Sequence, residues 1–404
     1  MQIKHTGGVK KGNPVVFGVL REMIRPFLYL LYGFKFERKT AKGIYSPCCI
    51  LANHQTIIDQ FAVSMGFNFS IHYVGSDTLF RYGFKSWLMK ILVRPIPFSK
   101  GNSDMTALKN IMSVIREGGC VGMFPSGNRS FYGTESTIVP GVGKLIKKLK
   151  APLVLVQLRG GFFTKPRWMA KPSRGTMRAY VTRVVSPKEQ ASMSYADIDR
   201  IIQQELCFDD YAYNRTANIS FHGRRRAEYI ESVLFYCPQC SNLESLCSEG
   251  CDIFCRNCNA RVRINNKGFF EKITNAQHIP DTALAWSHIQ LDYIKNYDFS
   301  GFTDKPVFCD DHVTLSIAER ARKEYFLGKG SIAFFADRLS VCGKDFPFTE
   351  TTMAVQGVRK LTIYHNNEVY AAEVPFRTNL VKYMICGYHL RNKALGLQEG
   401  YYGY

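Results

Sequence analysis

Two spacings of apolar residues alternate through the first half of the chain. Uninterrupted apolar runs at 48–52 and 120–124 stop at Asn53 and Pro125, and short runs bounded in this way are typical of buried strands. The segment 105–117 between them has one apolar face at helical spacing, made by Leu108, Ile111, Met112 and Ile115. Strands that alternate with helices predict an α/β domain built on a mixed, mainly parallel sheet.

The second half of the chain changes to a strand-rich pattern. A helix is predicted over 281–297, with Asp281 as its cap, and a final helix over 379–390. Short apolar runs separated by turn residues predict strands at 331–335, 338–342, 360–364 and 368–372. Several antiparallel strands followed by one helix resemble a pleckstrin-homology-like domain in architecture.

Residues 1–44 have the pattern of amphipathic helices that associate with a membrane. Asn13-Pro14 supplies a helix cap and a proline at the first helical position. Apolar residues gather on one face, at Val16, Leu20, Met23, Phe27, Leu30, Leu31 and Phe34. Pro26 predicts a kink and therefore two short interfacial helices; the alternative is one helix packed on the domain's own sheet.

The sequence shows neither a membrane span nor a cleavable signal peptide. No uncharged apolar stretch reaches the roughly 18 residues that a spanning helix needs. Charged residues interrupt the apolar segment near the amino terminus, and no small-residue cleavage site follows. We therefore expect a cytoplasmic protein, peripheral on the inner face of the cell membrane.

The charge is strongly positive and unevenly spread. The formal net charge is +20, and residues 138–188 hold twelve lysines and arginines but no acidic residue. An anionic membrane surface is one partner that such a segment suits, and Phe162, Phe163 and Trp168 within it predict an aromatic loop that dips into the interface. Nucleic acid is the rival partner, but nothing in the chain matches a groove-reading or base-stacking module.

The chemistry-bearing residues follow the two apolar runs. His54 and Asp59 stand five positions apart after the first run, and the segment 124–130, Phe-Pro-Ser-Gly-Asn-Arg-Ser, follows the second. Strand ends of this kind are where open α/β sheets place ligands, although a histidine and an aspartate at this spacing also occur at ordinary helix starts, here capped by Asn53. The pair and the later segment together resemble the motifs of the glycerophospholipid acyltransferase family, of the 1-acyl-sn-glycerol-3-phosphate acyltransferase type.

The resemblance implies acyl transfer to a glycerol hydroxyl. His54 would act as the general base that takes the hydroxyl proton, and Asp59 would orient it. Arg129, with Lys100 as helper, would hold the acceptor phosphate together with Ser126, Gly127 and Asn128, and backbone N–H groups around Gly127 and Asn128 would face the developing oxyanion. The donor would be an acyl-CoA or an acyl-carrier-protein (acyl-ACP) thioester, and the acceptor a lysophospholipid similar to lysophosphatidic acid.

One position departs from the family's pattern. The family ordinarily has a glutamate between the proline and the glycine of the second motif, and this chain has Ser126. A serine keeps a hydroxyl but loses the charge. A tolerated variant, a changed acceptor and a catalytically silenced lipid-binding scaffold are the three explanations, and the retained His54 and Asp59 favour activity.

Four of the thirteen cysteines have metal-ligand spacing. Two C-x-x-C pairs, Cys237 with Cys240 and Cys255 with Cys258, are the pattern of a four-cysteine zinc ribbon. A site closed by four thiolates leaves no position for water, so we expect structural Zn²⁺. Cys247 and Cys251 lie between the pairs and are poorer candidates; a ribbon that binds nucleic acid, with Arg224-Arg225-Arg226 upstream, stays an alternative.

These patterns suggest a chain of several domains. The expected order is amphipathic helices at 1–44, an acyltransferase domain at 45–210, a linker at 211–235, a zinc ribbon at 236–270, a helical connector at 271–304 and a β-rich domain at 305–404. Some bacterial acyltransferases of the resembled type carry such a ribbon after the catalytic domain. The predicted function is acyl transfer in phospholipid synthesis.

Overall fold

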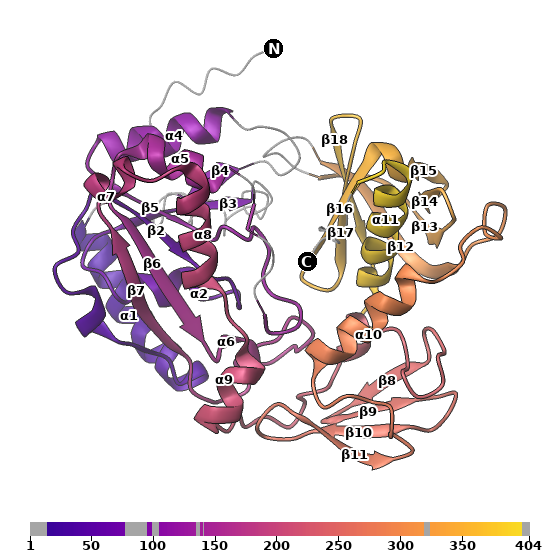
Figure 1. Ribbon diagram of the computed structural model, residues 1–404. Coiled ribbons are helices and arrows are strands. Elements are labelled where there is room, and N and C mark those ends of the chain that lie inside the picture. The colour runs from indigo at the N-terminus through magenta and orange to yellow at the C-terminus, as the bar shows by residue number, and fades with distance from the viewer. Residues whose placement is uncertain are drawn as a thin grey trace. The chain divides into compact units, whose positions relative to one another are not determined.

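A computed structural model describes residues 14–76, 95–98, 105–134, 138–139, 141–318 and 324–397. The chain forms two compact units (Figure 1). The amino-terminal unit comprises 1–165 and 172–221, and the carboxyl-terminal unit comprises 166–171 and 222–404. The chain therefore passes between the units three times, and the short segment 166–171 belongs to the second unit.

The amino-terminal unit is built on one sheet with strands in the order β1-β7-β6-β2-β5-β3-β4. All neighbouring pairs are parallel except β6 with β7. The strands are β1 Lys35–Phe36, β2 Cys48–Ala52, β3 Ile71–Ser76, β4 Ile96–Phe98, β5 Cys120–Met123, β6 Leu153–Arg159 and β7 Arg178–Val185. The predicted α/β domain with a mixed, mainly parallel sheet is confirmed.

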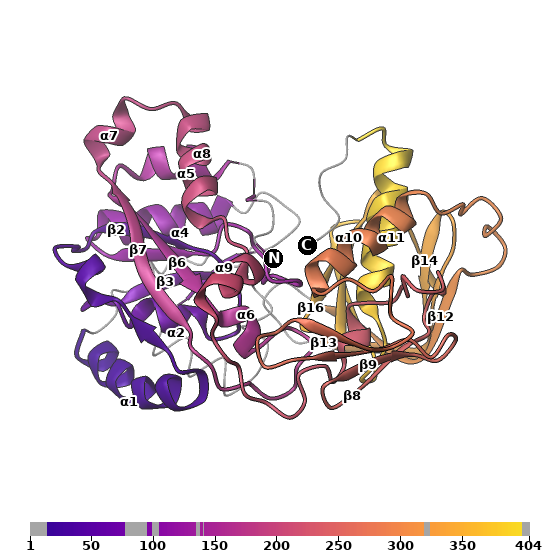
Figure 2. The ribbon, with the colours of Figure 1, turned by 60° about the horizontal axis from the view of Figure 1, so that its bottom comes forward.

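Helices cover both faces of this sheet, as Figure 2 shows for α1 on one side and α5 and α8 on the other. They are α1 Pro14–Tyr32, α2 Asp59–Ser64, α4 Met105–Arg116, α5 Val142–Leu149, α6 Gly161–Thr164, α7 Pro187–Ala191, α8 Tyr195–Leu206 and α9 Asp210–Ala217. Strand β2 shows why the sheet is apolar throughout. Ile50 and Ala52 join the core on one face and Leu51 the core on the other, because successive side chains of a strand point to opposite faces.

Helix α1 is one helix with Pro26 inside it, so the prediction of two short helices is wrong. Leu28 and Tyr32 are buried, with Ile24 packed against the same core, because residues four apart lie on one face of a helix. Neither Leu28 nor Tyr32 belongs to the apolar face that the sequence predicts. In the described part of the chain, no helix is long and apolar enough to cross a bilayer.

The carboxyl-terminal unit holds two antiparallel sheets. The smaller, in the order β11-β10-β9-β8, is formed by β8 Leu246–Glu249, β9 Asp252–Cys255, β10 Arg261–Ile264 and β11 Phe270–Thr274. The larger, in the order β15-β14-β13-β12-β18-β17-β16, is formed by β12 Phe308–Ala318, β13 Glu324–Phe334, β14 Arg338–Val341, β15 Lys344–Pro347, β16 Thr351–Gln356, β17 Lys360–His365 and β18 Glu368–Glu373. Among the described residues of this unit, the α-helices are α10 Ala283–Lys295 and α11 Leu380–Ala394.

Several local predictions need correction. Helix α10 is capped by Thr282, whose side chain accepts from Ala285 N, and not by Asp281. Strands β12, β15 and β16 were not predicted. Residues 211–217, at the start of the expected linker, belong to α9, which Asp209 caps by accepting from Ala212 N.

The predicted interfacial aromatic loop is also wrong. Phe162, Phe163 and Trp168 are all buried. Both phenylalanine rings contact Tyr211 of α9, and the Trp168 indole N–H donates to the carbonyl oxygen of Arg226. These rings stabilise the protein interior and are not available to a bilayer.

Candidate active site and cysteine cluster

Three neighbouring strands bring their carboxyl ends to one edge of the sheet. Strands β5, β2 and β6 are parallel neighbours, so the loops that follow them lie side by side. Residue His54 follows β2, the segment 124–130 follows β5, and α6 follows β6. The backbone N–H of Ser130 donates to the carbonyl oxygen of His54 at 2.8 Å, which joins the two predicted motifs directly.

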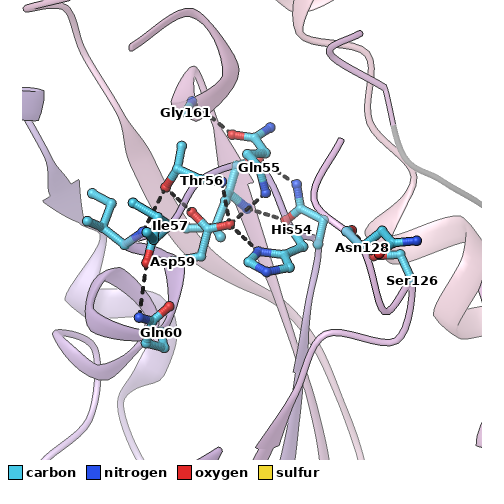
Figure 3. A network of polar contacts seen from close by, with 12 residues as sticks. His54, Gln55, Thr56, Ile57, Asp59, Gln60, Ser126, Asn128 and Gly161 are labelled. Atoms are coloured by element: carbon cyan, nitrogen blue, oxygen red, sulfur yellow. Dashed lines mark hydrogen bonds and ion pairs between the residues drawn. The ribbon is translucent and has the colours of Figure 1, made fainter. Parts of the chain in front are cut away.

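His54 and Asp59 form a hydrogen-bonded pair. His54 Nδ1 lies 2.8 Å from Asp59 Oδ2, and the imidazole is about one-fifth exposed whereas the carboxylate is fully buried. Asp59 is the first residue of α2, where the helix dipole favours a negative charge. Figure 3 shows the two side chains facing each other.

Asp59 is held by more than the histidine. Its Oδ2 also accepts from the backbone N–H groups of Gln55 and Thr56, at 2.6 and 2.8 Å, and its Oδ1 accepts from Thr56 Oγ1 at 2.6 Å. An ionised carboxylate only accepts hydrogen bonds, so the proton of a neutral His54 is assigned to Nδ1. The Nε2 lone pair is then the basic one.

The imidazole has a fixed plane as well as a fixed hydrogen bond. The rings of His54 and Phe124 are stacked with centroids 4.2 Å apart, and Tyr73 stacks on Phe124 in turn at 6.0 Å. Gly122 allows this arrangement, since a Cβ there would lie 2.6 Å from the Tyr73 ring. Phe124 therefore fixes the plane of the His54 ring.

The two sequence neighbours of His54 bind the segment after β6. Asn53 both donates to and accepts from the backbone of Leu158, at 2.9 and 2.6 Å. Gln55 Oε1 accepts from Gly161 N at 2.8 Å, and a Cβ at Gly161 would lie 2.4 Å from that oxygen. The sequence predicts Asn53 only as a helix cap and gives no signal that Gln55 binds the segment after β6.

Gln55 also reaches a buried carboxyl group. Its Nε2 donates to Asp210 Oδ1 at 3.1 Å, and Asp210 accepts from Gly160 N and Phe162 N at 3.3 Å each. Burial raises the pKa of Asp210 to about 7, against the opposing effects of these hydrogen bonds and of Arg159. No sequence signal identified Asp210, because its partner Gln55 is 155 positions away.

The serine of the second motif faces its own turn. Ser126 is buried and its Oγ donates to the carbonyl oxygen of Asn128 at 3.0 Å. Gly127 has a φ of +67°, a conformation that favours glycine, and its N–H donates to the carbonyl oxygen of Phe124 at 3.0 Å. The Gly127 N–H is thus used within the turn, contrary to the expectation that it faces an oxyanion.

Two basic side chains of the amino-terminal unit have lowered pKa values. Burial lowers the pKa of Arg129, and the Asp59 carboxylate acts on it in the opposite direction. Burial and the nearby Arg129 together lower the pKa of Lys165 to about 8. Lys100, the predicted helper, lies outside the described residues; strand β4, which precedes it, is described only at Ile96–Phe98.

The four predicted cysteines converge in the carboxyl-terminal unit. The Sγ atoms of Cys237, Cys240, Cys255 and Cys258 all lie within 4.8 Å of one another. A tetrahedral zinc ion with Zn–S bonds of about 2.3 Å separates its sulfurs by about 3.8 Å, and the observed Cys237–Cys258 and Cys240–Cys255 distances are 3.9 and 3.7 Å. The donor set fits a metal, and neither Cys247 nor Cys251 belongs to the cluster.

The amino-terminal unit thus has a hydrogen-bonded histidine–aspartate pair at the edge of an α/β sheet. Residues 34–158 match the family model described as Acyltransferase. A 1-acyl-sn-glycerol-3-phosphate acyltransferase of Bacillus subtilis (strain 168) is 26% identical over 140 residues, which are 34% of this chain and 68% of that protein. Both matches support the glycerophospholipid acyltransferase family for this part of the chain.

A solved structure is also similar. The crystal structure of the 1-acyl-sn-glycerophosphate (LPA) acyltransferase PlsC from Thermotoga maritima has a TM-score of 0.42 and 16% sequence identity, and the match covers 50% of this chain and 79% of that one.

Proposed function

We propose that this protein transfers a fatty acyl group from an acyl-CoA or acyl-ACP thioester to the free hydroxyl of a lysophosphatidic-acid-like acceptor, as a step in phospholipid synthesis. The observation that carries the proposal is the 2.8 Å contact between His54 Nδ1 and the buried Asp59 carboxylate. The family match and the name of the Bacillus subtilis relative support the substrate class.

The mechanism needs only these groups and the substrates. His54 Nε2 takes the proton of the acceptor hydroxyl as its oxygen attacks the thioester carbonyl carbon. Asp59 stabilises the imidazolium that forms, because its carboxylate already accepts from Nδ1. The carbon–sulfur bond then breaks, the thiolate leaves, and the proton on Nε2 passes to it, so that an ester and a free thiol are released.

Arg129 is our choice for the residue that binds the acceptor phosphate. Its proximity to Asp59, through the effect of that carboxylate on its pKa, supports this role, and a guanidinium suits a phosphate because it donates two parallel hydrogen bonds. Lys100 remains a proposed helper, with Ser126, Gly127 and Asn128 forming the turn that carries Arg129.

An acyl-transfer assay tests the proposal. Purified protein is offered acyl-CoA and acyl-ACP in turn, each with lysophosphatidic acid, glycerol 3-phosphate or a neutral monoacylglycerol. We expect diacylated product and free thiol in equal amounts with lysophosphatidic acid. Absence of thiol release with every pair of donor and acceptor would contradict the proposed acyl-transfer activity and favour a silenced lipid-binding scaffold.

Ser126 is the reason to consider a catalytically silenced scaffold as the alternative to an active enzyme. Its buried hydroxyl donates within its own turn, so it takes no part in the proton transfer above. We propose that the serine is a tolerated variant. Ser126→Glu should then lower activity, because a carboxylate forced into this buried turn breaks the bond to Asn128 and disturbs Arg129; a gain of activity would show that the missing charge limits the enzyme.

We further propose that α1 docks the protein on an anionic membrane. Its outward side exposes half or more of each of five apolar side chains at spacings of four and three residues: Val15, Val19, Met23, Phe27 and Leu30. A helix of this kind lies in a bilayer interface. Sedimentation with vesicles containing phosphatidylglycerol should recover the wild type but not the double variant V19E/F27E, with I289E, at an exposed apolar residue of α10, as the control.

In the carboxyl-terminal unit we propose a structural zinc ion at the four cysteines. We also propose that the larger sheet and α11 form a domain of pleckstrin-homology-like architecture. The sulfur distances support the metal. The antiparallel order of the seven strands, followed by one helix, supports the architecture. Metal analysis of protein purified without chelator should find about one zinc per chain.

A further inference from the structure

Asp210 lies outside both motifs that resemble the acyltransferase family, as the first residue of α9. Its side chain is fully buried. Oδ1 accepts from Gln55 Nε2 at 3.1 Å and from Gly160 N at 3.3 Å, and Oδ2 accepts from Phe162 N at 3.3 Å. This carboxyl group therefore joins the loop that follows β2 to the start of α6.

The backbone of Asp210 is bonded to the segment that follows β5. Its N–H donates to the carbonyl oxygen of Gly133 at 2.9 Å, and Gly133 N donates to Ser130 Oγ at 2.9 Å. Ser130 N donates in turn to the carbonyl oxygen of His54 at 2.8 Å. Because Gln55 follows His54 in the chain, these bonds close a ring that runs from Asp210 through the segment after β5 to the base and back.

Gln55 is the member of this ring that stands next to the base, and it is fully buried. Its amide is used at both ends, since Oε1 accepts from Gly161 N, as Figure 3 shows, while Nε2 donates to Asp210. Its backbone N–H donates to Asp59 Oδ2 at 2.6 Å. The same oxygen lies 2.8 Å from His54 Nδ1, so a shift of Gln55 would disturb the contact that orients the imidazole.

A general base works only when it is held close to its productive position, and a misplacement of about 1 Å can cost roughly a hundredfold in rate. His54 and the segment 124–130 lie on loops of different strands, so contacts between distant residues must fix their separation. We propose that Asp210 and Gln55 are positioning residues that hold His54 in place relative to the segment after β5. Both side chains are fully buried and act through His54. This inference deepens the proposed function and rests on it.

The first variant is Gln55→Met, which keeps the length of the side chain and removes both amide hydrogen bonds. Gln190→Met is the matched control. Gln190 is also buried, and its Nε2 donates to the carbonyl oxygens of Ala151 and Val185, at the amino-terminal end of β6. Gln55→Met should lower kcat by about tenfold to a hundredfold and leave KM close to the wild-type value. Gln190→Met should lower the melting temperature and keep kcat.

A second set of variants tests the contact between the two side chains. Asp210→Asn should also lower kcat, because an amide cannot accept from all three donors. Gln55→Glu places two carboxyl groups opposite each other and should lose activity. In the double variant Gln55→Glu/Asp210→Asn, the new carboxylate can accept from Gly161 N and from the new amide, so much of the lost kcat should return. A double variant no more active than Gln55→Glu would overturn the role of this contact.

A further measurement does not depend on turnover. Nitrogen-15 NMR of histidine side chains reports which ring nitrogen carries the proton, and the spectrum of His54→Ala assigns the His54 signal. In the wild type the proton of the neutral ring should lie on Nδ1, as the contact with Asp59 requires. Gln55→Met should give a mixture of the two tautomers, whereas Gln190→Met should keep the wild-type signal.

The outcomes are separable. Absence of acyl transfer by the wild-type protein overturns the proposed function, and the NMR experiment still tests the two positioning residues. Wild-type kcat in both Gln55→Met and Asp210→Asn overturns this inference alone. Equal losses of kcat in Gln55→Met and Gln190→Met, or an unchanged His54 signal in Gln55→Met, overturn it as well.

Discussion

The His54–Asp59 pair and the cysteine cluster are assembled in opposite ways. The four cysteines come from one stretch, Cys237–Cys258, and two C-x-x-C turns suffice to gather their sulfurs. The His54 loop is local only in its contact with Asp59. Several other contacts that hold this loop come from distant residues, including Leu158, Gly161 and Asp210. A short sequence can encode a metal site because the ion forms a strong bond with each of its ligands. A general base has no such ion, so many weaker contacts must orient it.

The largest effect should come from His54→Ala, which removes the base and leaves the supporting contacts in place. Turnover should fall roughly a hundredfold to ten-thousandfold. Melting temperature and far-UV circular dichroism should stay close to the wild type, because the side chain is partly exposed at a loop. His288→Ala, at an exposed histidine of α10, is the control, and wild-type kcat in His54→Ala would end the proposed mechanism.

Asp59→Asn should lower kcat by about a hundredfold or more while changing KM little. An amide cannot accept from all the groups that now donate to the two carboxylate oxygens, so the His54 tautomer is no longer fixed. Stability should also fall by about 1–3 kcal/mol, because buried N–H groups lose an acceptor. Steady-state kinetics and urea unfolding measure the two effects; a KM effect without a kcat effect would assign Asp59 to substrate binding instead.

Cys240→Ser should affect stability more than chemistry. Loss of a thiolate should release the zinc and lower the melting temperature of the carboxyl-terminal unit by on the order of 10 °C. Cys309→Ser, at an exposed cysteine outside the cluster, should change neither zinc content nor melting temperature. Elemental analysis beside calorimetry tests this, and full zinc content in Cys240→Ser would remove Cys240 from the ligand set.

Asp210 should make the amino-terminal unit less stable as the pH rises from about 4 to about 7. The pKa of this carboxyl is raised to about 7 in the folded protein and is about 3.9 in an unfolded chain. In this range the folded state keeps a proton that the unfolded state has lost, so the free energy of unfolding falls with increasing pH. Asp210→Asn should remove that slope, and Asp292→Asn, at an exposed site on α10, should keep it.

Urea unfolding at several pH values between 4.5 and 7.5 gives these slopes. A wild-type slope equal to that of Asp210→Asn would mean that Asp210 is ionised throughout this range.

The smallest effect should come from Ser126→Ala. The variant loses one hydrogen bond inside a turn, from Ser126 Oγ to the Asn128 carbonyl oxygen, worth about 0.5–1.5 kcal/mol. Turnover should stay within experimental error of the wild type. A large loss of kcat without loss of stability would show that the hydroxyl acts on the substrate.

Much of the fold followed from apolar spacing. Strands β2 and β5 and helix α4 lie where the pattern predicts them, because an uninterrupted apolar run must be buried on both faces of a sheet. The apolar pattern did not predict elements whose buried and exposed residues do not follow a regular spacing. Strand β12 alternates buried and exposed positions only in part, and α9 is a helix through its Asp209 cap rather than through an apolar face.

By itself, the sequence determined which residues are candidates for chemistry: His54 with Asp59, Arg129 and the four cysteines all lie within short motifs whose spacing is sufficient to recognise them. Only the tertiary structure decided what surrounds them. It paired Gln55 with Asp210, buried the aromatic residues 162–163 and buried Tyr32. The reason is that parallel strand pairing sets which loops become neighbours, and that pairing joins residues too far apart in the chain for any local pattern to record.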